Sequence, residues 1–248
     1  MEQDLKECFT HGVFRGTRCP ECGNTSKLLM DEREVDGLGK ILAGMLRHFP
    51  ERYGVHLDDH GWIPIRNIVG PIQNHRMHYG WLTAHHVKAL AVTEPKGRYE
   101  VNEEGEIRAR YGHTIPVNMD DLPTDGVPEV LFYQTTPEEK EFIFESGISP
   151  SDKTWIHLSR DYRQAYVSGR FHTEEPEIVS VDVNALVESG MPVYRATDEI
   201  FLTSSVPVEF IRLAEPEEVT LTPEELEMID QVKEKRERRK NFSGRDSY

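Results

Sequence analysis

Apolar residues recur at helical spacing before Pro50, which predicts one amphipathic helix over about residues 34–49. The residues of its apolar stripe are Ile41, Leu42, Met45, Leu46 and Phe49. At about 100° per residue, Arg47 lies nearly opposite this stripe, and His48 lies about a quarter-turn away. The pattern predicts that both side chains face away from the packed side, and a solvated helix face is the simplest interpretation.

Two more helices and a β-hairpin follow along the chain. The predicted elements are a short strand at residues 62–65, helices at 65–72 and 84–92, and hairpin strands at 98–101 and 107–111. Period-two spacing places Arg108 and Arg110 on one face of the second hairpin strand. Helices followed by a hairpin indicate a small winged-helix-like lobe.

The pattern changes after residues 120–128, whose prolines, aspartates and glycine are typical of a linker. The predicted strands are residues 129–133, 154–158, 177–183, 193–196, 200–203 and 208–213, with helices at 138–145 and 162–168. This alternation favours an α+β fold with a mostly antiparallel sheet.

The last segment predicts a charged terminal helix. Thr222-Pro223-Glu224-Glu225 forms a capping box, with proline at the first helical position. Basic residues from Lys233 to Lys240 suit the negative end of the helix dipole. We interpret the segment as a solvated helix, with binding of a partner as the alternative.

Composition and charge narrow the class of ligand. The 248-residue chain has a formal charge of -15, which disfavours general coating of nucleic acid, because Lys and Arg supply most non-specific affinity. Screening confines surface fields to about 10 Å, so a local basic pocket for a phosphate group stays compatible with this charge. No apolar stretch approaches the roughly 20 residues of a membrane span. Residues 1–6 carry no secretory signal, and we expect a cytoplasmic, monomeric protein without membrane contact.

All three cysteines lie within the first 22 residues and are spaced with a histidine as two pairs. Cys8-x2-His11 and Cys19-x2-Cys22 predict a closed tetrahedral zinc site, which is structural because no position is left open for water. Three cysteines cannot all form disulfides, and unmetallated buried or reactive thiols are the alternative. A second group, His75, His78, His85 and His86, is better interpreted as surface histidines than as metal ligands.

The common nucleophile and nucleotide-binding signatures are absent from the sequence, but seven short segments, four of which carry an arginine, occur in order. They are Leu46-Arg47-His48-x-Pro50, Asp58-x-x-Gly61-Trp62, Lys96-Gly97-Arg98-Tyr99-Glu100, Ile107-Arg108-Ala109-x-x-Gly112-His113-Thr114, Gly147-Ile148-Ser149-Pro150, His157-Leu158-Ser159 and Ala165-x-Val167-x-Gly169-Arg170. Together they resemble the RNA 2′-phosphotransferase family over residues 38–213. The zinc-ligating extension is similar to that of archaeal members.

This resemblance implies an NAD-dependent enzyme that removes an internal 2′-phosphate from RNA, an activity associated with tRNA splicing and processing. It implies a zinc-binding extension (residues 1–33), a winged-helix-like RNA lobe (34–122), an ADP-ribosyltransferase-like NAD lobe (123–214) and a charged helical tail (215–248). The natural RNA stays open, because archaeal members need not encounter spliced tRNA that carries a 2′-phosphate.

The resemblance also implies which residues form the site. The family's catalytic Arg-His-Arg-Arg set falls on Arg47, His48, Arg98 and Arg170. Guanidinium groups bind a phosphate dianion through paired hydrogen bonds, and such a clamp can supply most of the catalysis of phosphoryl transfer. The residues implied to contact NAD are Gly112, His113, Thr114, Tyr133, Gln134 and Ser159.

Three segments depart from the family pattern. In Leu131-Phe132-Tyr133-Gln134-Thr135-Thr136, Gln134 stands for a family histidine unless the alignment shifts by one residue. Asp198-Glu199 stands for Asn-Gly, and Tyr111 stands for Gln. Two alternative functions follow: a zinc-containing RNA-binding protein with a decayed NAD lobe, and an ADP-ribosyltransferase that acts on terminal phosphates of nucleic acid.

Overall fold

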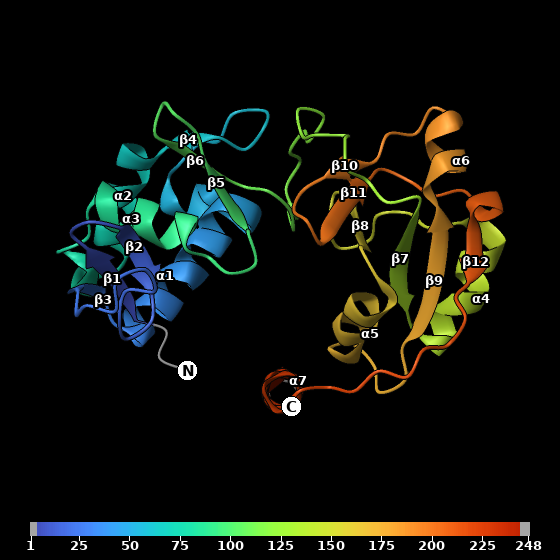
Figure 1. The fold of residues 1–248 in the computed structure, drawn as a ribbon. Helices are drawn as coiled ribbons and strands as arrows, with labels where there is room; N and C mark the ends of the chain where they lie inside the picture. The colour runs from blue at the N-terminus through green and yellow to red at the C-terminus, as the bar shows by residue number, and fades with distance from the viewer. Residues whose placement is uncertain (1–3, 244–248) are drawn as a thin grey trace. The chain divides into compact units, whose positions relative to one another are not determined.

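The computed structural model describes residues 4–243 and divides the chain into two compact units. The first unit holds the described residues up to Leu122 together with Ser151–Trp155, and the second holds Pro123–Pro150 and the residues from Ile156 onward. Both units combine helices with antiparallel sheets, which confirms the predicted α+β class (Figure 1). Residues 1–3 of the predicted extension and 244–248 of the predicted tail lie outside the described residues. Over residues 4–243, no helix has the length and apolarity that a membrane span requires.

The first unit begins with a small antiparallel sheet that the sequence pattern did not predict. Its strands are β1 (Leu5–Cys8), β2 (Gly12–Arg15) and β3 (Lys27–Met30), in the order β2-β1-β3. Leu5, Leu29 and Met30 are buried in the core of the first unit. Asp31 then caps the next helix by accepting a hydrogen bond from the Glu34 N–H, so the small sheet leads directly into that helix.

Three helices and a second small sheet complete the first unit (Figure 1). The helices are α1 (Glu32–Ala43), α2 (Ile65–His75) and α3 (Ala84–Val92), and the sheet has the order β4 (Ile63–Pro64), β6 (Glu106–Ala109) and β5 (Tyr99–Val101). The predicted helices at 65–72 and 84–92 and the predicted hairpin are thereby confirmed. Their buried faces include Leu38, Ile68, Leu90 and Ile107, which pack into one core.

The predicted helix at residues 34–49 is wrong in its last turn. The α-helix ends at Ala43, and a π-helical turn spans Gly44–His48, with the Phe49 N–H donating to the Gly44 carbonyl at 2.8 Å. A π-turn closes its hydrogen bonds over five residues, so each residue advances less around the axis than in an α-helix. Met45 and Leu46 stay in the core, whereas Phe49 leaves the stripe and is 41% exposed.

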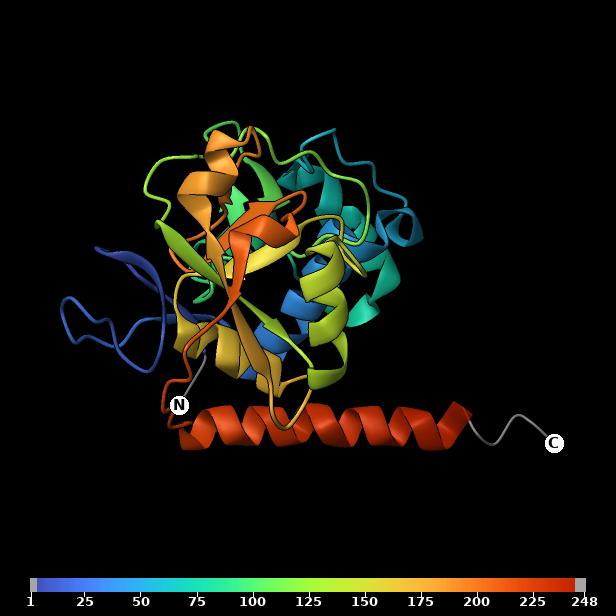
Figure 2. The same ribbon diagram turned by 90° about the vertical axis from the view of Figure 1, so that its right-hand side faces the viewer.

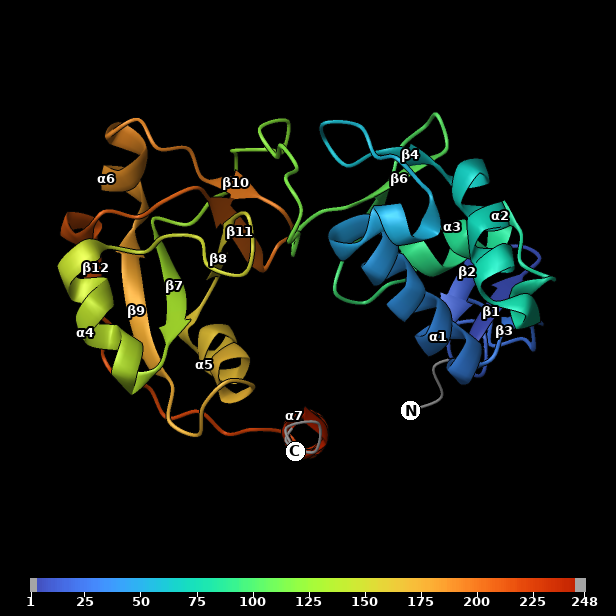
Figure 3. The same ribbon diagram turned by 180° about the vertical axis from the view of Figure 1, so that it is seen from behind.

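The second unit is built on a six-stranded antiparallel sheet with helices on both faces. The strand order is β10 (Tyr194–Arg195), β11 (Ile200–Thr203), β8 (Ile156–Ser159), β7 (Val130–Thr135), β9 (Glu177–Asp182) and β12 (Ile211–Leu213). Figures 1 and 3 show α5 (Tyr162–Arg170) on one face and α4 (Pro137–Ser146) and α6 (Val183–Glu188) on the other.

Alternation along the strands explains this arrangement. Phe132 and Ile178 pack with α5 residues, whereas Leu131 and Val179 belong to the larger core on the opposite face. Helix α6 was not predicted, because its first residue, Val183, continues the apolar run of β9. Asp182 ends that run by accepting a hydrogen bond from the Ala185 N–H, which caps the helix.

The tail forms helix α7 (Pro223–Ser243), seen side on in Figure 2. The predicted capping box is confirmed, because Thr222 and Glu225 each accept a hydrogen bond from the other's N–H. The helix is not simply solvated, since three links attach it to α5 and the residues after it. These links are Arg163 with Glu225 at 2.8 Å, Lys233 with Glu174 at 3.0 Å, and Arg236 with the Phe171 carbonyl at 2.5 Å.

Candidate active site and metal centre

Arg47, in the π-turn, is not on a solvated face as the helical phase predicted. Its guanidinium carbon lies 4.9 Å from the centroid of the Tyr111 ring and 5.9 Å from that of Tyr99. Its Nε and Nη2 are buried and have no hydrogen-bond partner among the described residues. Burial lowers the pKa of Arg47, and the two tyrosines offset part of this change. A guanidinium held between aromatic rings with two unsatisfied donors is suited to bind anionic oxygens.

Gly112 makes the position of Arg47 possible. Its φ is +86°, which a residue with a side chain rarely adopts, and a Cβ there would lie 3.2 Å from Nη1 of Arg47 and 3.3 Å from its Cζ. The glycine therefore serves both the backbone turn and the close approach of the guanidinium.

Replacing Gly112 with alanine should displace the Arg47 guanidinium and strain the backbone. We expect a loss of about 1–2 kcal/mol in the free energy of unfolding, as for other incompatible backbone positions. Denaturant unfolding and turnover should both report it, and Gly105→Ala is the control. Gly105 also has a positive φ (+77°), but no atom lies within 4 Å of its Cβ position. If both variants retained the same activity, the packing of Arg47 on Gly112 would be irrelevant to the site.

His48 is oriented by Thr114. The His48 Nδ1 lies 3.0 Å from the Thr114 hydroxyl, and the Thr114 N–H donates to the Arg47 carbonyl at 2.9 Å. Burial lowers the pKa of His48, and the charges of Arg47 and Lys153 lower it further. The lowered pKa favours the neutral imidazole, whose Nδ1 is held by Thr114.

Arg98 is held by a carboxylate. Its Nη1 lies 3.2 Å from Oε1 of Glu94, and its backbone N–H donates to Glu94 Oε2 at 2.9 Å. The Glu94 side chain is only 7% exposed. Burial raises the pKa of Tyr111, while Arg47 and a hydrogen bond from Arg98 act to lower it. Both arginines thus meet at Tyr111, and the first unit brings Arg47, His48 and Arg98 into one neighbourhood.

Arg108 does not belong to this neighbourhood. Its side chain is buried and pairs with Glu100 at 3.0 Å and Asp121 at 2.7 Å, and its guanidinium carbon lies 4.4 Å from the Trp62 ring centroid. Arg110 reaches the same Glu100 at 3.6 Å, which confirms that the two arginines share a face of β6 and its continuation. Two carboxylates already neutralise Arg108, so it serves the fold rather than an anion.

His113 has the most strongly shifted pKa among the histidines of the described residues. It is 2% exposed, and its Nε2 has no hydrogen-bond partner within residues 4–243. Burial, together with the charges of Arg47, His48 and Arg108, lowers its pKa from the ordinary 6.5 to about 3. Its carbonyl accepts from the Thr154 N–H at 3.0 Å, which ties Ser151–Trp155 to the first unit.

The free energy of unfolding should depend on pH through His113. Between pH 6.5 and about 3 the unfolded chain binds a proton there and the folded chain does not, so stability is lost as the pH falls. One such group contributes up to about 1.4 kcal/mol per pH unit in that window. Denaturant unfolding of the wild type and of His113→Gln across pH 7 to 4 should show a shallower slope for the variant. Equal slopes would contradict the buried neutral state.

The second unit holds the remaining predicted site residues. Arg170 ends α5, and its Nε is buried without a hydrogen-bond partner among the described residues. A Cβ on the preceding Gly169 would lie 3.2 Å from Cβ of Gln134 on β7. Gln134 and the end of α5 are therefore neighbours. Tyr133 precedes Gln134 on β7, and the buried Ser159 ends the adjacent β8.

The predicted zinc ligands converge in the small N-terminal sheet. One donor atom from each of Cys8, His11, Cys19 and Cys22 lies within 4.8 Å of all the others. Tetrahedral zinc with Zn–S bonds of about 2.3 Å places two sulfurs roughly 3.8 Å apart, and a sulfur and a nitrogen slightly closer. The Cys8 and Cys22 sulfurs lie 3.8 Å apart, and His11 Nδ1 lies 3.6 Å from Cys8 Sγ and 3.4 Å from Cys19 Sγ. The four residues therefore fit a zinc ion.

The electrostatics of Cys8 also suit a metal. Backbone N–H groups of Thr10 and His11 lower the pKa of Cys8 to about 6, which favours the thiolate that binds metal. Among residues 4–243 this is the single group of side chains that converges in this way. The four clustered histidines do not: His85 pairs with Glu7, His86 bonds the Thr83 N–H, and His75 and His78 contact Tyr53 and Tyr79.

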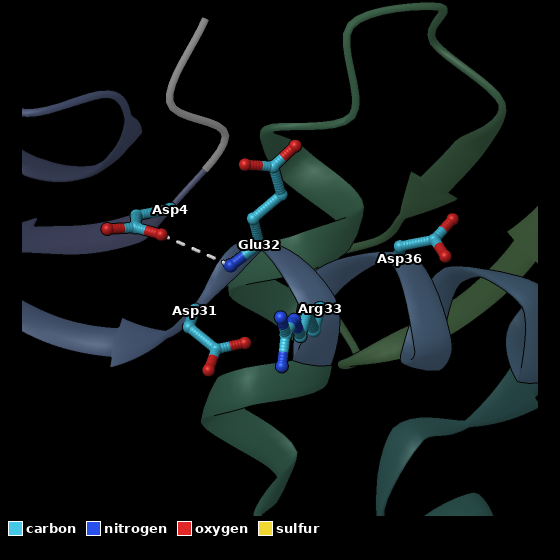
Figure 4. A pocket seen from close by; sticks show the side chains of 5 residues that line it. All are labelled: Asp4, Asp31, Glu32, Arg33 and Asp36. Atoms are coloured by element: carbon cyan, nitrogen blue, oxygen red, sulfur yellow. Dashed lines mark hydrogen bonds between the residues drawn. The ribbon is translucent and has the colours of Figure 1, made fainter.

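A hollow of about 510 Å³ lies at the start of α1 (Figure 4). Its lining residues are Asp4, Asp31, Glu32, Arg33 and Asp36. Asp4 accepts from the Glu32 N–H at 3.1 Å, and Asp31 caps the helix, so these carboxylates satisfy backbone donors. Their charge opposes phosphate binding, and the hollow is not a candidate phosphate site.

Two aromatic residues and one carboxylate of the site were missed from the sequence. Tyr111 was noticed only as a departure from the family pattern, Tyr99 only as the neighbour of Arg98, and Glu94 was not noticed at all. Each of the two tyrosines directly follows an arginine in the sequence, and this pairing was the available signal.

Comparison with known proteins identifies the family. The sequence model of the RNA 2′-phosphotransferase, Tpt1 / KptA family matches residues 32–205. A "Probable RNA 2'-phosphotransferase" of Thermoplasma acidophilum is 49% identical over 94% of this chain and 97% of its own length. The protein of the same name from Thermoplasma volcanium is 44% identical over 98% of this chain and 99% of its own length. The one from Methanosarcina barkeri is 35% identical over 85% of this chain and 99% of its own length. The chain therefore belongs to the RNA 2′-phosphotransferase family, a family of transferases.

Proposed function

We propose that this protein removes an internal 2′-phosphate from RNA with NAD as co-substrate. The observation that carries the proposal is the setting of the half-buried Arg47. Two of its guanidinium nitrogens have no hydrogen-bond partner among the described residues. Its guanidinium lies over the Tyr111 ring, whose hydroxyl is bonded to Arg98, and His48 is the next residue in the chain. A 2′-phosphate monoester with nearly two negative charges matches this set of donors.

The proposed reaction has two steps. An oxygen of the RNA 2′-phosphate attacks the anomeric carbon of the nicotinamide ribose, the glycosidic bond breaks, and nicotinamide leaves. The 2″-hydroxyl of the ADP-ribose then attacks phosphorus, the bond from phosphorus to the RNA 2′-oxygen breaks, and RNA with a 2′-hydroxyl is released. The other product is ADP-ribose 1″,2″-cyclic phosphate, and the proton of the 2″-hydroxyl passes to the RNA 2′-oxygen.

We assign Arg47, His48 and Arg98 to the phosphate and Arg170 to charge that develops in the second step. Fixed cationic donors stabilise a phosphoryl transition state without reorganising, which is the main source of catalysis in such reactions. Because Nδ1 of His48 is bonded to Thr114, its Nε2 is the atom that would donate to a phosphate oxygen or carry a proton.

The residues proposed to contact NAD are Gly112, His113, Thr114, Tyr133, Gln134 and Ser159. Two of them also have a fold role that sharpens the proposal. The Thr114 hydroxyl orients His48, and the Nε2 of the buried His113 has no hydrogen-bond partner among the described residues. Gln134 retains hydrogen-bonding groups but cannot become cationic, so it would bind NAD through its amide alone.

We further propose a winged-helix-like RNA lobe at residues 34–122 and an ADP-ribosyltransferase-like NAD lobe at 123–214. Helices α2 and α3 followed by the β5–β6 hairpin support the first assignment. Arg66, Lys88 and Glu104 are among the residues that line a hollow of about 240 Å³ near the starts of these two helices, and the two basic side chains supply positive charge for an RNA backbone. The extension at residues 1–33 would hold one structural zinc, and the tail at 215–248 and the monomeric state stay predictions.

The test is incubation of the protein with an oligoribonucleotide that carries one internal 2′-phosphate, with and without NAD. We expect loss of the 2′-phosphate and equimolar release of nicotinamide and ADP-ribose cyclic phosphate. RNA binding without nicotinamide release would instead favour a decayed NAD lobe. Accumulation of an ADP-ribosylated RNA phosphate would favour an ADP-ribosyltransferase, and no binding of the phosphorylated RNA at all would contradict the proposal.

A further inference from the structure

Arg15 links the metal-binding sheet to the turn that follows α3. It ends β2 and lies outside residues 32–205, the part of the chain matched by the family. Its Nε donates to the Thr93 hydroxyl at 3.4 Å, and that hydroxyl donates to the Ala89 carbonyl at 2.7 Å. Arg15 is thus attached to the residue directly before Glu94.

Glu94 is the group that orients Arg98. One carboxylate oxygen accepts from the Arg98 and Lys96 N–H groups at 2.9 and 3.0 Å, and the other lies 3.2 Å from Arg98 Nη1. Burial lowers the pKa of Arg15, while the charge of Glu94 raises it and that of Arg98 lowers it. Arg15 therefore lies within electrostatic reach of both partners.

A nearly buried carboxylate beside a phosphate-binding arginine has a cost. It fixes the guanidinium in one orientation, but it also cancels part of its charge and repels an incoming phosphate. A second guanidinium, on β2 and bonded to the same turn, offsets that negative charge without displacing Arg98, so the local balance returns to positive.

We propose that Arg15 is a positioning residue for the RNA 2′-phosphate. It holds the Thr93–Glu94 turn and offsets the charge of Glu94, so that Arg98 stays both oriented and available to the phosphate. The metal-binding sheet, through β2, thereby contributes to phosphate recognition as well as to the fold. This inference rests on the proposed function, because it assumes that Arg98 binds the phosphate.

The experiment compares the affinity of the full-length protein for two oligoribonucleotides that differ only in an internal 2′-phosphate or 2′-hydroxyl. Arg15→Ala should lower the ratio of the two affinities by about tenfold, within the range of couplings measured in ion-pair networks. Arg15→Lys should recover most of the ratio, since the charge remains. Arg18→Ala is the matched control, because Arg18 lies on the same sheet-bearing segment and its side chain donates to the nearby Gly23 carbonyl at 3.1 Å, away from the Thr93–Glu94 turn.

A double-mutant cycle with Arg98→Ala separates positioning from direct contact. If Arg15 acts through Arg98, Arg15→Ala should cause no further loss in the Arg98→Ala background. Thr93→Val removes the hydroxyl that accepts from Arg15 but keeps the side-chain shape, and it should also lower the ratio of the two affinities. This second variant keeps the proposal testable if Arg15→Ala does not fold.

The possible failures are distinguishable. A wild-type protein that binds both RNAs equally would overturn the proposed function itself. A wild type that prefers the phosphorylated RNA, with Arg15→Ala indistinguishable from Arg18→Ala, would overturn only the role of Arg15. Additive losses in the cycle would show that Arg15 acts independently of Arg98 and would also overturn it.

Discussion

Replacing Arg47 with methionine is expected to lower turnover of 2′-phosphorylated RNA by about 10²- to 10³-fold, the usual effect of removing one donor to a developing charge. The melting temperature should stay the same or rise. Methionine fills a similar space beside the tyrosine rings, and it removes two buried nitrogens that find no hydrogen-bond partner in the described part of the chain. Single-turnover kinetics and thermal unfolding measure the two effects.

Two further variants make this result specific. Arg47→Lys keeps the charge but lacks the planar fork, so its turnover should fall between those of the wild type and the methionine variant. Arg52 also stacks on an aromatic ring, with its guanidinium carbon 4.1 Å from the Phe49 centroid, but it belongs to the next turn. Arg52→Met should leave turnover within about threefold of the wild type, as expected for a surface substitution. A loss of stability without a loss of activity in Arg47→Met would reverse the assignment.

Replacing Cys19 with serine is expected to abolish metal binding and to destabilise the first unit. The purified wild type should contain about one zinc per chain, because its four ligand atoms fit a closed tetrahedral site. Binding of structural zinc supplies folding free energy directly, about 10–16 kcal/mol in isolated peptides. The strands beside the metal ligands place Leu5, Leu29 and Met30 in the core, so loss of the metal should lower the melting temperature rather than loosen only a terminus.

Elemental analysis and thermal unfolding with and without a chelator test this expectation. The matched variant is Cys22→His, which changes the donor set from three sulfurs to two while keeping four ligands. Cys22 is exposed and has room for the larger ring, so this variant should retain zinc. Equal zinc content in the wild type and Cys19→Ser, or none in either, would contradict the site.

Local periodicity predicted most of the fold because each element buries one face. The helices α2 and α3 and the strands of the second unit follow patterns of 3.6 or two residues that need no knowledge of distant contacts. The small N-terminal sheet β2-β1-β3 was missed because its four-residue strands are too short and too polar to show alternation. Helix α6 was missed because an apolar strand runs directly into it.

The site was harder to predict than the fold. The metal ligands follow from spacing alone, because both pairs are close in the chain. The surroundings of Arg47 do not, since Tyr99, Tyr111 and Gly112 lie more than 50 residues away and meet it only through tertiary packing. The Glu94 carboxylate was equally invisible, because no pattern in the sequence marks a charged residue that will be buried.

The π-turn at Gly44–His48 makes the length of this segment critical. It accommodates one residue more than an α-helical turn, with the Phe49 N–H reaching back to Gly44 rather than to Met45. A single-residue deletion here would yield an uninterrupted α-helix and shift Arg47 and His48 by about 100° around its axis. Such a deletion could preserve a packed helix and still remove both side chains from the site. A change of length in this stretch can therefore inactivate the protein as fully as a substitution of Arg47, without altering the fold.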